Sequence, residues 1–169
     1  MIKITISSIS FIIILLNLSI FNSYGSPISK CIPTESFAIS GLTHGDPAQM
    51  VIQKLGNPIK KDPWGEKIDG EFKAIYNTET WIYRNIKIDI TNGHILSIST
   101  ISSECSTPNG IRPGLTKLDV LRILKMPLDA AVKKEKEIQI ANCGPEAYLV
   151  LIFNDQNILE RLELGIDLP

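Results

Sequence analysis

Two pairs of side chains have the types that a hydrolytic site needs. His44 lies two residues before Asp46, and Glu66 lies three residues before Asp69. Hydrolysis requires a base within hydrogen-bond reach of a nucleophile or a water, and a third group that orients the base. No serine stands in a G-x-S-x-G nucleophile motif. The sequence therefore predicts a protein that is not an enzyme, with a small envelope hydrolase as the more distant alternative.

The cysteines and histidines are too dispersed to resemble a metal site, because structural zinc sites use closely spaced pairs of ligands. The chain holds three cysteines and two histidines: Cys31, Cys105, Cys143, His44 and His94. In an oxidising compartment, three cysteines favour one bridge and one remaining thiol. We expect Cys105 to pair with Cys143; a Cys31 to Cys105 bridge and three buried, reduced thiols are the alternatives. No metal and no cofactor are predicted.

Large aromatic and polar side chains alternate with isoleucines between residues 81 and 90. A single strand with this pattern would place its isoleucines under a helix and the other side chains on the opposite face. The predicted partner-binding residues on that face are Trp81, Tyr83, Asn85 and Lys87, joined by Tyr148 from the second half of the chain. Aromatic side chains supply much of the energy at protein interfaces. In the alternative, these rings are buried in a core shared by the two halves.

Trp64 forms a second candidate contact, in a loop of charged and turn-forming residues that spans 60–70. An exposed tryptophan in a loop can fill a pocket on a partner protein. In the alternative, Trp64 folds back as a lid over its own helix.

The elements that position these residues come from an internal repeat. Seven positions recur at one constant offset and without a gap: Gly41, Leu42, Gly45, Val51, Ile52, Leu55 and Pro58 return as Gly110, Ile111, Gly114, Val120, Leu121, Leu124 and Pro127. Such self-similarity predicts two copies of one small structural unit.

Each copy is predicted to contain helices followed by strands. The apolar spacing of three and four residues indicates an amphipathic helix, with Asp46 before Pro47 as the first helix cap and Thr116 as the second. The period then changes to two, which predicts strands over 81–90, 95–101, 148–153 and 158–164, with further strands near 72–76 and 132–140. Asn92-Gly93 predicts a hairpin turn. The predicted fold is α+β: two tandem units, each a helical hairpin followed by an antiparallel meander sheet.

The N-terminal segment 1–25 resembles an export signal. Lys3 precedes an apolar stretch, and the small residues Ser23 and Gly25 predict cleavage before Ser26. An uncleaved anchor is the alternative, although polar residues interrupt the apolar run. The predicted organisation is a signal peptide (1–25), an N-terminal segment (26–36), a first repeat (37–104) and a second repeat (105–169).

Loss of Lys3 would leave 16 basic and 18 acidic side chains and a net charge of −2. This balance gives no indication of nucleic acid or an anionic membrane as a partner.

The motif G-[LI]-x-x-G, a helix that ends in L-G-x-P and a meander with an Asn-Gly turn resemble the SmpA/OmlA (BamE-like) outer-membrane assembly family. The matching residues are Gly41, Gly45, Leu55, Gly56, Pro58 and Asn92-Gly93 in the first copy, and Gly110, Gly114, Leu124 and Pro127 in the second. The doubling is similar in architecture to β-lactamase inhibitory protein, whose paired units form one concave binding surface. The chain departs from the family at Lys125, which replaces a glycine, and in lacking the lipid-acceptor cysteine.

These observations predict an exported, periplasmic or secreted protein that binds another envelope or secreted protein, as an inhibitor or immunity-type binder would. The resemblance implies an alternative role as a structural accessory in outer-membrane assembly. We expect no stable membrane insertion after signal cleavage. The sequence identifies neither the partner nor the oligomeric state.

Overall fold

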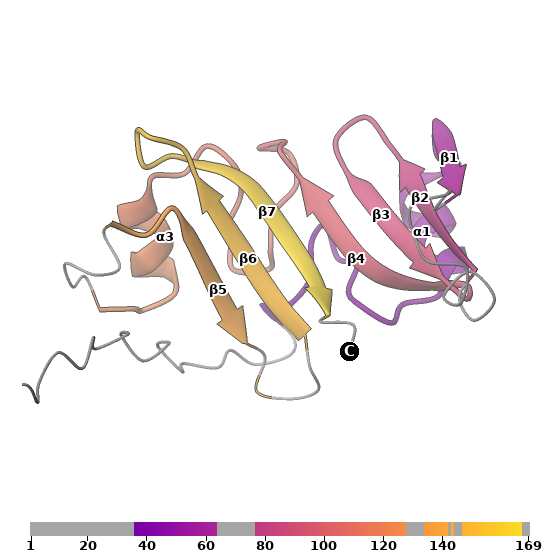
Figure 1. Ribbon diagram of the computed structural model, residues 1–169, viewed down its shortest axis with the longest axis horizontal. Coiled ribbons are helices and arrows are strands. Elements are labelled where there is room, and N and C mark those ends of the chain that lie inside the picture. Colours follow the sequence, from indigo (N-terminus) through magenta and orange to yellow (C-terminus); the bar gives the residue numbers. More distant parts are fainter. Residues whose placement is uncertain (1–35, 64–76, 128–133, 142, 144–146, 167–169) are drawn as a thin grey trace, which may run out of the picture.

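The computed structural model describes residues 36–63, 77–127, 134–141, 143 and 147–166. The described chain folds as two short helices and a single sheet of seven antiparallel strands (Figure 1). The elements in chain order are α1 (Ala48–Leu55), β1 (Lys60–Pro63), β2 (Thr78–Ile82), β3 (Lys87–Thr91), β4 (His94–Thr100), α3 (Lys117–Ile123), β5 (Glu137–Ala141), β6 (Ala147–Phe153) and β7 (Leu159–Ile166).

The strand order is β1-β2-β3-β4-β7-β6-β5, so the two outer strands are β1 and β5. The halves of the chain meet where β4 pairs with β7, in the middle of the sheet (Figure 1). Three residue pairs define this junction: Ile98 with Leu164, Ser99 with Glu163, and Thr100 with Leu162. The single sheet therefore depends on a pairing between segments that lie far apart in the sequence.

One face of the sheet carries a continuous hydrophobic core. Ile88 on β3, Ile98 on β4 and Leu151 on β6 are fully buried, and Val51 of α1 and Val120 of α3 pack in the same cluster. Burial of each such side chain contributes about 1.5 to 3 kcal/mol. Because both helices join one cluster, they cover the same face of the sheet. In Figure 1, α1 lies behind β2 and β3, at the opposite end of the sheet from α3.

The predicted division into two units, each with a helical hairpin and its own sheet, is wrong. Strands from both halves form one sheet, and each half contributes one short helix to the described structure. Gly45 and Gly114 have φ angles of 82° and 96°, which right-handed helices do not allow. The segment before each helix is therefore a turn, and the amides of these glycines donate to Ile95 O (2.9 Å) and Leu159 O (2.8 Å) at the sheet.

The repeated motif nevertheless takes the same local geometry in both halves of the sheet. Ala48 and Lys117, which occupy equivalent positions of the two copies, are the first residues of α1 and α3. Their amides donate to Gly93 O and Asn157 O, each at 2.8 Å. Each helix is thus tied at its start to a hairpin turn of the sheet.

The segment 81–90 is two strands instead of the predicted one. β2 ends at Ile82 and β3 begins at Lys87, and the Tyr83 amide donates to Ile86 O (3.0 Å) across the turn between them. Trp81 therefore lies opposite Ile88, and both point into the core. The turn reverses the alternation before it, so the predicted faces of Trp81 and Ile82 are wrong.

Local predictions elsewhere gave mixed results. The Asn92-Gly93 turn is confirmed between β3 and β4, with φ angles of 50° and 79°. The Thr116 cap is also confirmed, because its hydroxyl accepts from the Asp119 amide at 3.2 Å. The Asp46 cap is wrong: Pro47 is the N-cap of α1 and no side chain caps this helix.

Several predictions concern residues that the structure does not describe. These are the signal peptide at 1–25, the segment 26–35, the strand near 72–76 and residues 132–133 of the strand predicted over 132–140. In the described part of that last segment the strand begins only at Glu137, as β5. Within the described residues, neither helix is long and apolar enough to span a membrane.

Candidate functional site

The sheet face opposite the helices is called the open face here. Its side chains alternate with those of the core, and no helix of the described chain covers it. The strand register places the following residues on it: Thr80 and Ile82 of β2, Lys87 and Asp89 of β3, Ser97 and Ser99 of β4, Arg161 and Glu163 of β7, and Tyr148, Val150 and Ile152 of β6.

A carboxylate is held in a fixed position on this face. Asp89 accepts hydrogen bonds from the Thr80 hydroxyl (2.6 Å) and the Ser97 hydroxyl (2.5 Å), which come from the two neighbouring strands. Charge-assisted hydrogen bonds of this kind are stronger than neutral ones. The carboxylate is therefore oriented before any partner arrives.

Tyr148 lies across the neighbouring strand β7. Its cross-strand partner is Gly165, and a Cβ atom at this glycine would meet the Tyr148 hydroxyl oxygen at 3.3 Å and Cζ at 3.4 Å. The same Cβ would lie 3.6 Å from Cβ of Ser97 on β4. The missing side chain at Gly165 thus leaves the space that the end of the tyrosine ring occupies.

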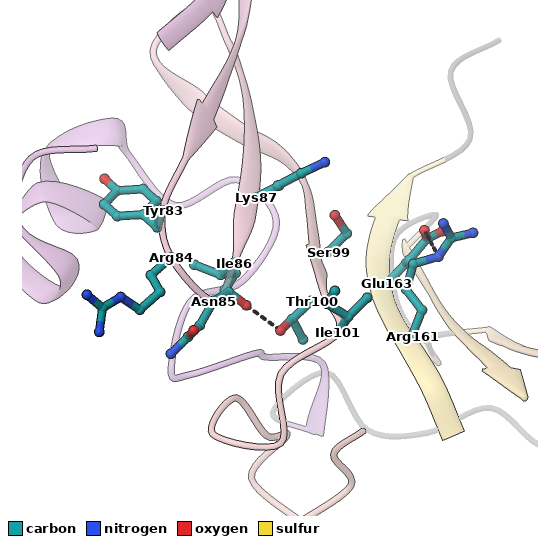
Figure 2. A pocket seen from close by; sticks show the side chains of 10 residues that line it. All are labelled: Tyr83, Arg84, Asn85, Ile86, Lys87, Ser99, Thr100, Ile101, Arg161 and Glu163. Carbon is teal, nitrogen blue, oxygen red and sulfur yellow. Dashed lines mark hydrogen bonds and ion pairs between the residues drawn. The ribbon is translucent and has the colours of Figure 1, made fainter. Parts of the chain in front are cut away.

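A groove of about 220 Å³ lies where the β2–β3 turn and β3 approach the ends of β4 and β7 (Figure 2). Ten residues line it: Tyr83, Arg84, Asn85, Ile86, Lys87, Ser99, Thr100, Ile101, Arg161 and Glu163. Arg161 Nε pairs with Glu163 Oε1 at 2.8 Å, and the Thr100 hydroxyl donates to Asn85 O at 2.5 Å (Figure 2).

Two cationic side chains of the groove have no partner among the described residues. Arg84 and Lys87 are exposed, and their side chains make neither hydrogen bonds nor ion pairs with the rest of the described chain. The groove therefore holds two cationic side chains that form no ion pair with a carboxylate of the described chain.

The structure brings three of the predicted binding residues together and separates the others. Tyr83, Asn85 and Lys87 line the groove, whereas Tyr148 lies on the open face at β6. Trp81 is on the helix side, with only 3% of its surface exposed. Its indole Nε1 donates to Glu79 (2.6 Å), and the ammonium of Lys61 lies 3.8 Å from the ring centroid. Trp64 lies outside the described residues.

Tyr83 holds the β2–β3 turn against α1. Its hydroxyl donates to Gly56 O at 3.1 Å, just after the helix, and its ring packs against the core. Partial burial raises the pKa of Tyr83. The ring therefore has a structural role in the chain, with one side facing the groove.

Seven of the ten groove residues were not predicted as binding residues: Arg84, Ile86, Ser99, Thr100, Ile101, Arg161 and Glu163. For two of them the sequence contained a signal, because Arg161 and Glu163 flank Leu162 and precede Leu164 in a period-two pattern. That pattern assigns them to the face opposite the core. It does not say that β7 pairs with β4, and this pairing is what brings both residues into the groove that Lys87 lines.

The residues considered for hydrolysis form no catalytic arrangement in the described structure. The Asp46 carboxylate accepts from the Thr43 amide (2.9 Å) and makes no hydrogen bond to His44. Partial burial lowers the pKa of His44. Glu66 and Asp69 lie outside the described residues, and the described part contains no cluster of three His, Cys, Asp or Glu that could hold a metal ion.

The predicted Cys105 to Cys143 bridge is wrong, as is its Cys31 to Cys105 alternative, because Cys105 is a free thiol. It is buried, and its Sγ donates to Asn85 O at 3.7 Å, beneath the β2–β3 turn. Cys143 is exposed just after β5, the outer strand at the other end of the sheet. Cys31 lies outside the described residues.

No protein-family model matches the sequence, and no curated protein matches it. Solved structures do resemble the fold. One is a cysteine-rich secretory protein from Staphylococcus aureus, with a TM-score of 0.52 and 12% identity over 83% of this chain and 48% of that one. This chain therefore spans about half the length of that protein.

Two further structures are less similar. An extracellular protein containing an SCP domain from Bacillus anthracis has a TM-score of 0.45 and 13% identity, over 73% of this chain and 44% of that one. A DUF4309 family protein from Bacillus subtilis has a TM-score of 0.43 and 14% identity, over 75% and 83% of the two chains.

The single seven-stranded sheet and the fold shared with the Staphylococcus aureus protein overturn the resemblance to the SmpA/OmlA (BamE-like) family and to β-lactamase inhibitory protein. The repeated motif is made of turn glycines, helix positions and prolines, which unrelated folds also use at such places. At 12% identity, the likeness to the Staphylococcus aureus protein shows the fold alone.

Proposed function

We propose that this chain is an exported, non-catalytic protein-binding module, periplasmic or secreted, whose open face contacts another protein. The observation that carries the proposal is a sheet face, uncovered in the described structure, whose polar and aromatic side chains are already held in place. Asp89 is fixed by two hydroxyl groups, and Tyr148 is seated over Gly165.

Pre-organisation favours binding because an ordered side chain loses little conformational entropy when a partner arrives. Tyrosine adds to this effect, since it offers a large contact area with few rotatable bonds and is enriched among the residues that dominate binding energy. Tyr148 is half-buried, so part of its ring remains available for contact.

The dimensions of the face suit a protein partner. Strands in a sheet lie about 4.8 Å apart, so seven strands extend over about 30 Å. Small-molecule sites are instead enclosed cavities that bury most of the ligand. The groove beside Lys87 is open and small, and it is better suited to one segment of a larger partner.

Two observations support export. The segment 1–25 has the charge, apolar stretch and small residues of a signal peptide. The Staphylococcus aureus neighbour with a shared fold is described as a secretory protein.

The test is crosslinking and capture of the tagged mature chain from its own cell envelope and culture medium. The face variant is Tyr148→Ala/Lys87→Ala. The matched control, Leu118→Ala/Lys134→Ala, changes an exposed apolar residue of α3 and an exposed cationic residue of the segment before β5. Both variants should keep the circular dichroism spectrum of the native chain.

We expect one abundant protein to crosslink to the native chain and to the control, and to be lost with the face variant. Equal capture by all three chains would place the contact elsewhere, and the absence of any stoichiometric partner in both fractions would contradict the proposal.

A further inference from the structure

We infer that the groove beside Lys87 recognises an acidic segment of the partner protein, with a carboxylate next to an apolar side chain. This inference rests on the proposed function and adds to it the chemistry of the partner. It concerns the groove defined above, at the edge of the open face (Figure 2).

The cations of the groove come from separate segments that the fold brings together. Arg84 belongs to the β2–β3 turn, Lys87 to the start of β3, and Arg161 to β7. The single acidic side chain that lines the groove is Glu163. Figure 2 shows the Arg84 guanidinium pointing away from Ser99, so Lys87 and Arg161 are the cations that face Ser99, against one acidic side chain. The charge around Ser99 is therefore positive on balance and attracts anions.

The donors of this groove are available to a ligand. Arg84 and Lys87 have no side-chain partner in the described chain, and Arg161 pairs with Glu163 through Nε, at 2.8 Å. A guanidinium group has five N–H donors, so one such contact leaves most of the Arg161 donors for a carboxylate.

The register explains why one carboxylate can reach several of these groups. Lys87, Ser99 and Glu163 are consecutive cross-strand partners on β3, β4 and β7. Adjacent strands lie about 4.8 Å apart, so the Ser99 hydroxyl lies between the lysine and the Arg161–Glu163 pair. A carboxylate above Ser99 would have a neutral donor below it, Lys87 on one side, and the Arg161–Glu163 ion pair on the other.

The apolar part of the inference comes from Ile101, at the end of β4. This side chain is 73% exposed and lines both the groove and a neighbouring shallow depression of about 400 Å³. Pro113 and Ile158 also line the depression. An apolar side chain next to the acidic one would cover this surface and remove it from water.

A protein segment fits these features better than a lipid surface or a nucleic acid. Sites for anionic lipids typically gather four to eight basic residues, and nucleic acids need an extended basic surface. The groove has three cations, one of them already paired with a carboxylate, and the whole chain has a net charge of −1.

The test is an NMR titration of the ¹⁵N-labelled mature chain with a capped peptide of sequence Ser-Glu-Leu-Asp-Leu-Ser. The control peptide replaces both acids by their amides, and phosphatidylglycerol vesicles serve as a third probe. We expect the acidic peptide alone to shift the amide signals of Lys87, Ser99 and Ile101. Rising salt should weaken the effect, because it screens exposed charges.

Two variants make the test specific to charge. Lys87→Gln should weaken the binding of the acidic peptide to the groove by about 2- to 5-fold, the range expected for one exposed charge pair. Glu163→Gln should strengthen the binding of this peptide by a similar factor, because the substitution removes the competing carboxylate and releases Arg161 from its ion pair. A groove residue with a purely structural role would not produce a gain in affinity.

Equal shifts with the amide peptide, shifts distributed over the whole sheet, or no shift at all would overturn the inference. Loss of the groove signals with vesicles alone would overturn it in favour of a lipid surface. Failure of this inference is distinguishable from failure of the proposed function. If a partner crosslinks to the native chain but not to the face variant, the proposed function stands. A failed peptide titration would then show only that the partner segment is not acidic.

Discussion

Tyr148 reaches across β7 because Gly165 has no side chain in its way. A methyl group at this position would lie 3.3 Å from the tyrosine hydroxyl oxygen, which is closer than most carbon contacts in proteins. We predict that Gly165→Ala displaces the ring and lowers the free energy of unfolding by about 1 kcal/mol, the low end of the cost of overpacking, because the end of a half-buried ring can shift. Urea denaturation measures this loss.

A double-mutant cycle separates the contact from other effects of the methyl group. In a Tyr148→Ala background the ring is absent, so Gly165→Ala should lower the free energy of unfolding clearly less than it does in the native chain. An equal cost in both backgrounds would show that the ring does not occupy the space above Gly165.

His44 gives the chain a predictable dependence on pH. Burial lowers the pKa of His44 below its ordinary value of 6.5, so the folded chain binds this proton less readily than the unfolded chain. The free energy of unfolding should therefore fall as the pH decreases below about 6.5. We predict that His44→Gln makes this fall smaller, as measured by denaturant unfolding at pH 7.5 and pH 5.5.

The matched control for this measurement is His94→Gln, since His94 is exposed at the start of β4. In this control variant, the free energy of unfolding should change between pH 7.5 and pH 5.5 by nearly the same amount as in the native chain. If the His44 variant behaves like this control, the partial burial of His44 does not affect its protonation.

At the scale of elements, the two helices differ in how they begin. Thr116 caps α3: its hydroxyl accepts from the Asp119 amide and donates to the Asp119 carboxylate (2.6 Å). No side chain caps α1, where Pro47 is the N-cap. We predict that Thr116→Ala lowers the free energy of unfolding by about 1 kcal/mol, the usual cost of losing such a cap.

Thr116→Ser is the informative companion variant, because it keeps the hydroxyl group and should restore most of the stability. Thermal or urea unfolding of the three chains decides the matter. If serine and alanine are equally destabilising, the hydroxyl does not act as a cap and the methyl group of Thr116 carries the effect.

The β2–β3 turn shows how one local feature alters a whole pattern. The period-two pattern of residues 81–90 is interrupted only at Arg84, and no glycine or proline marks a turn. The chain nevertheless reverses at Arg84-Asn85, where Thr100 donates to the Asn85 carbonyl and the Tyr83 ring is fixed against Gly56. These contacts come from distant residues, so sequence alone could not locate the turn.

At the scale of the whole molecule, the junction of β4 and β7 makes the two halves one cooperative unit. Leu162 lies opposite Thr100 of the first half and Leu151 of the second, and it is fully buried. We predict that Leu162→Ala lowers the free energy of unfolding by about 2 to 5 kcal/mol, the usual cost of such a cavity. Amide hydrogen exchange should show β3 and β6 losing protection together.

Leu118→Ala is the control for this prediction, because Leu118 is 45% exposed on α3 and should change stability by less than about 0.5 kcal/mol. If Leu162→Ala reduces protection in β6 and leaves β3 unchanged, the halves unfold separately and the sheet is not one unit.

The sequence by itself determined the local features of this protein. The Asn92-Gly93 turn, the Thr116 cap, and the amphipathic helices with Val51 and Val120 all follow from residue type and short spacing. They could be predicted because neighbouring residues decide backbone turns, caps and helix periodicity.

Only the tertiary structure decided how these features combine. The pairing of β4 with β7 made one sheet of two repeats and brought Arg161 into the groove that Lys87 lines. The fold also buried Cys105 as a free thiol. Trp81 entered the core because the β2–β3 turn reversed the chain. Strand pairing and burial depend on contacts between residues far apart in the sequence, and short-range patterns contain no information about which segments will meet.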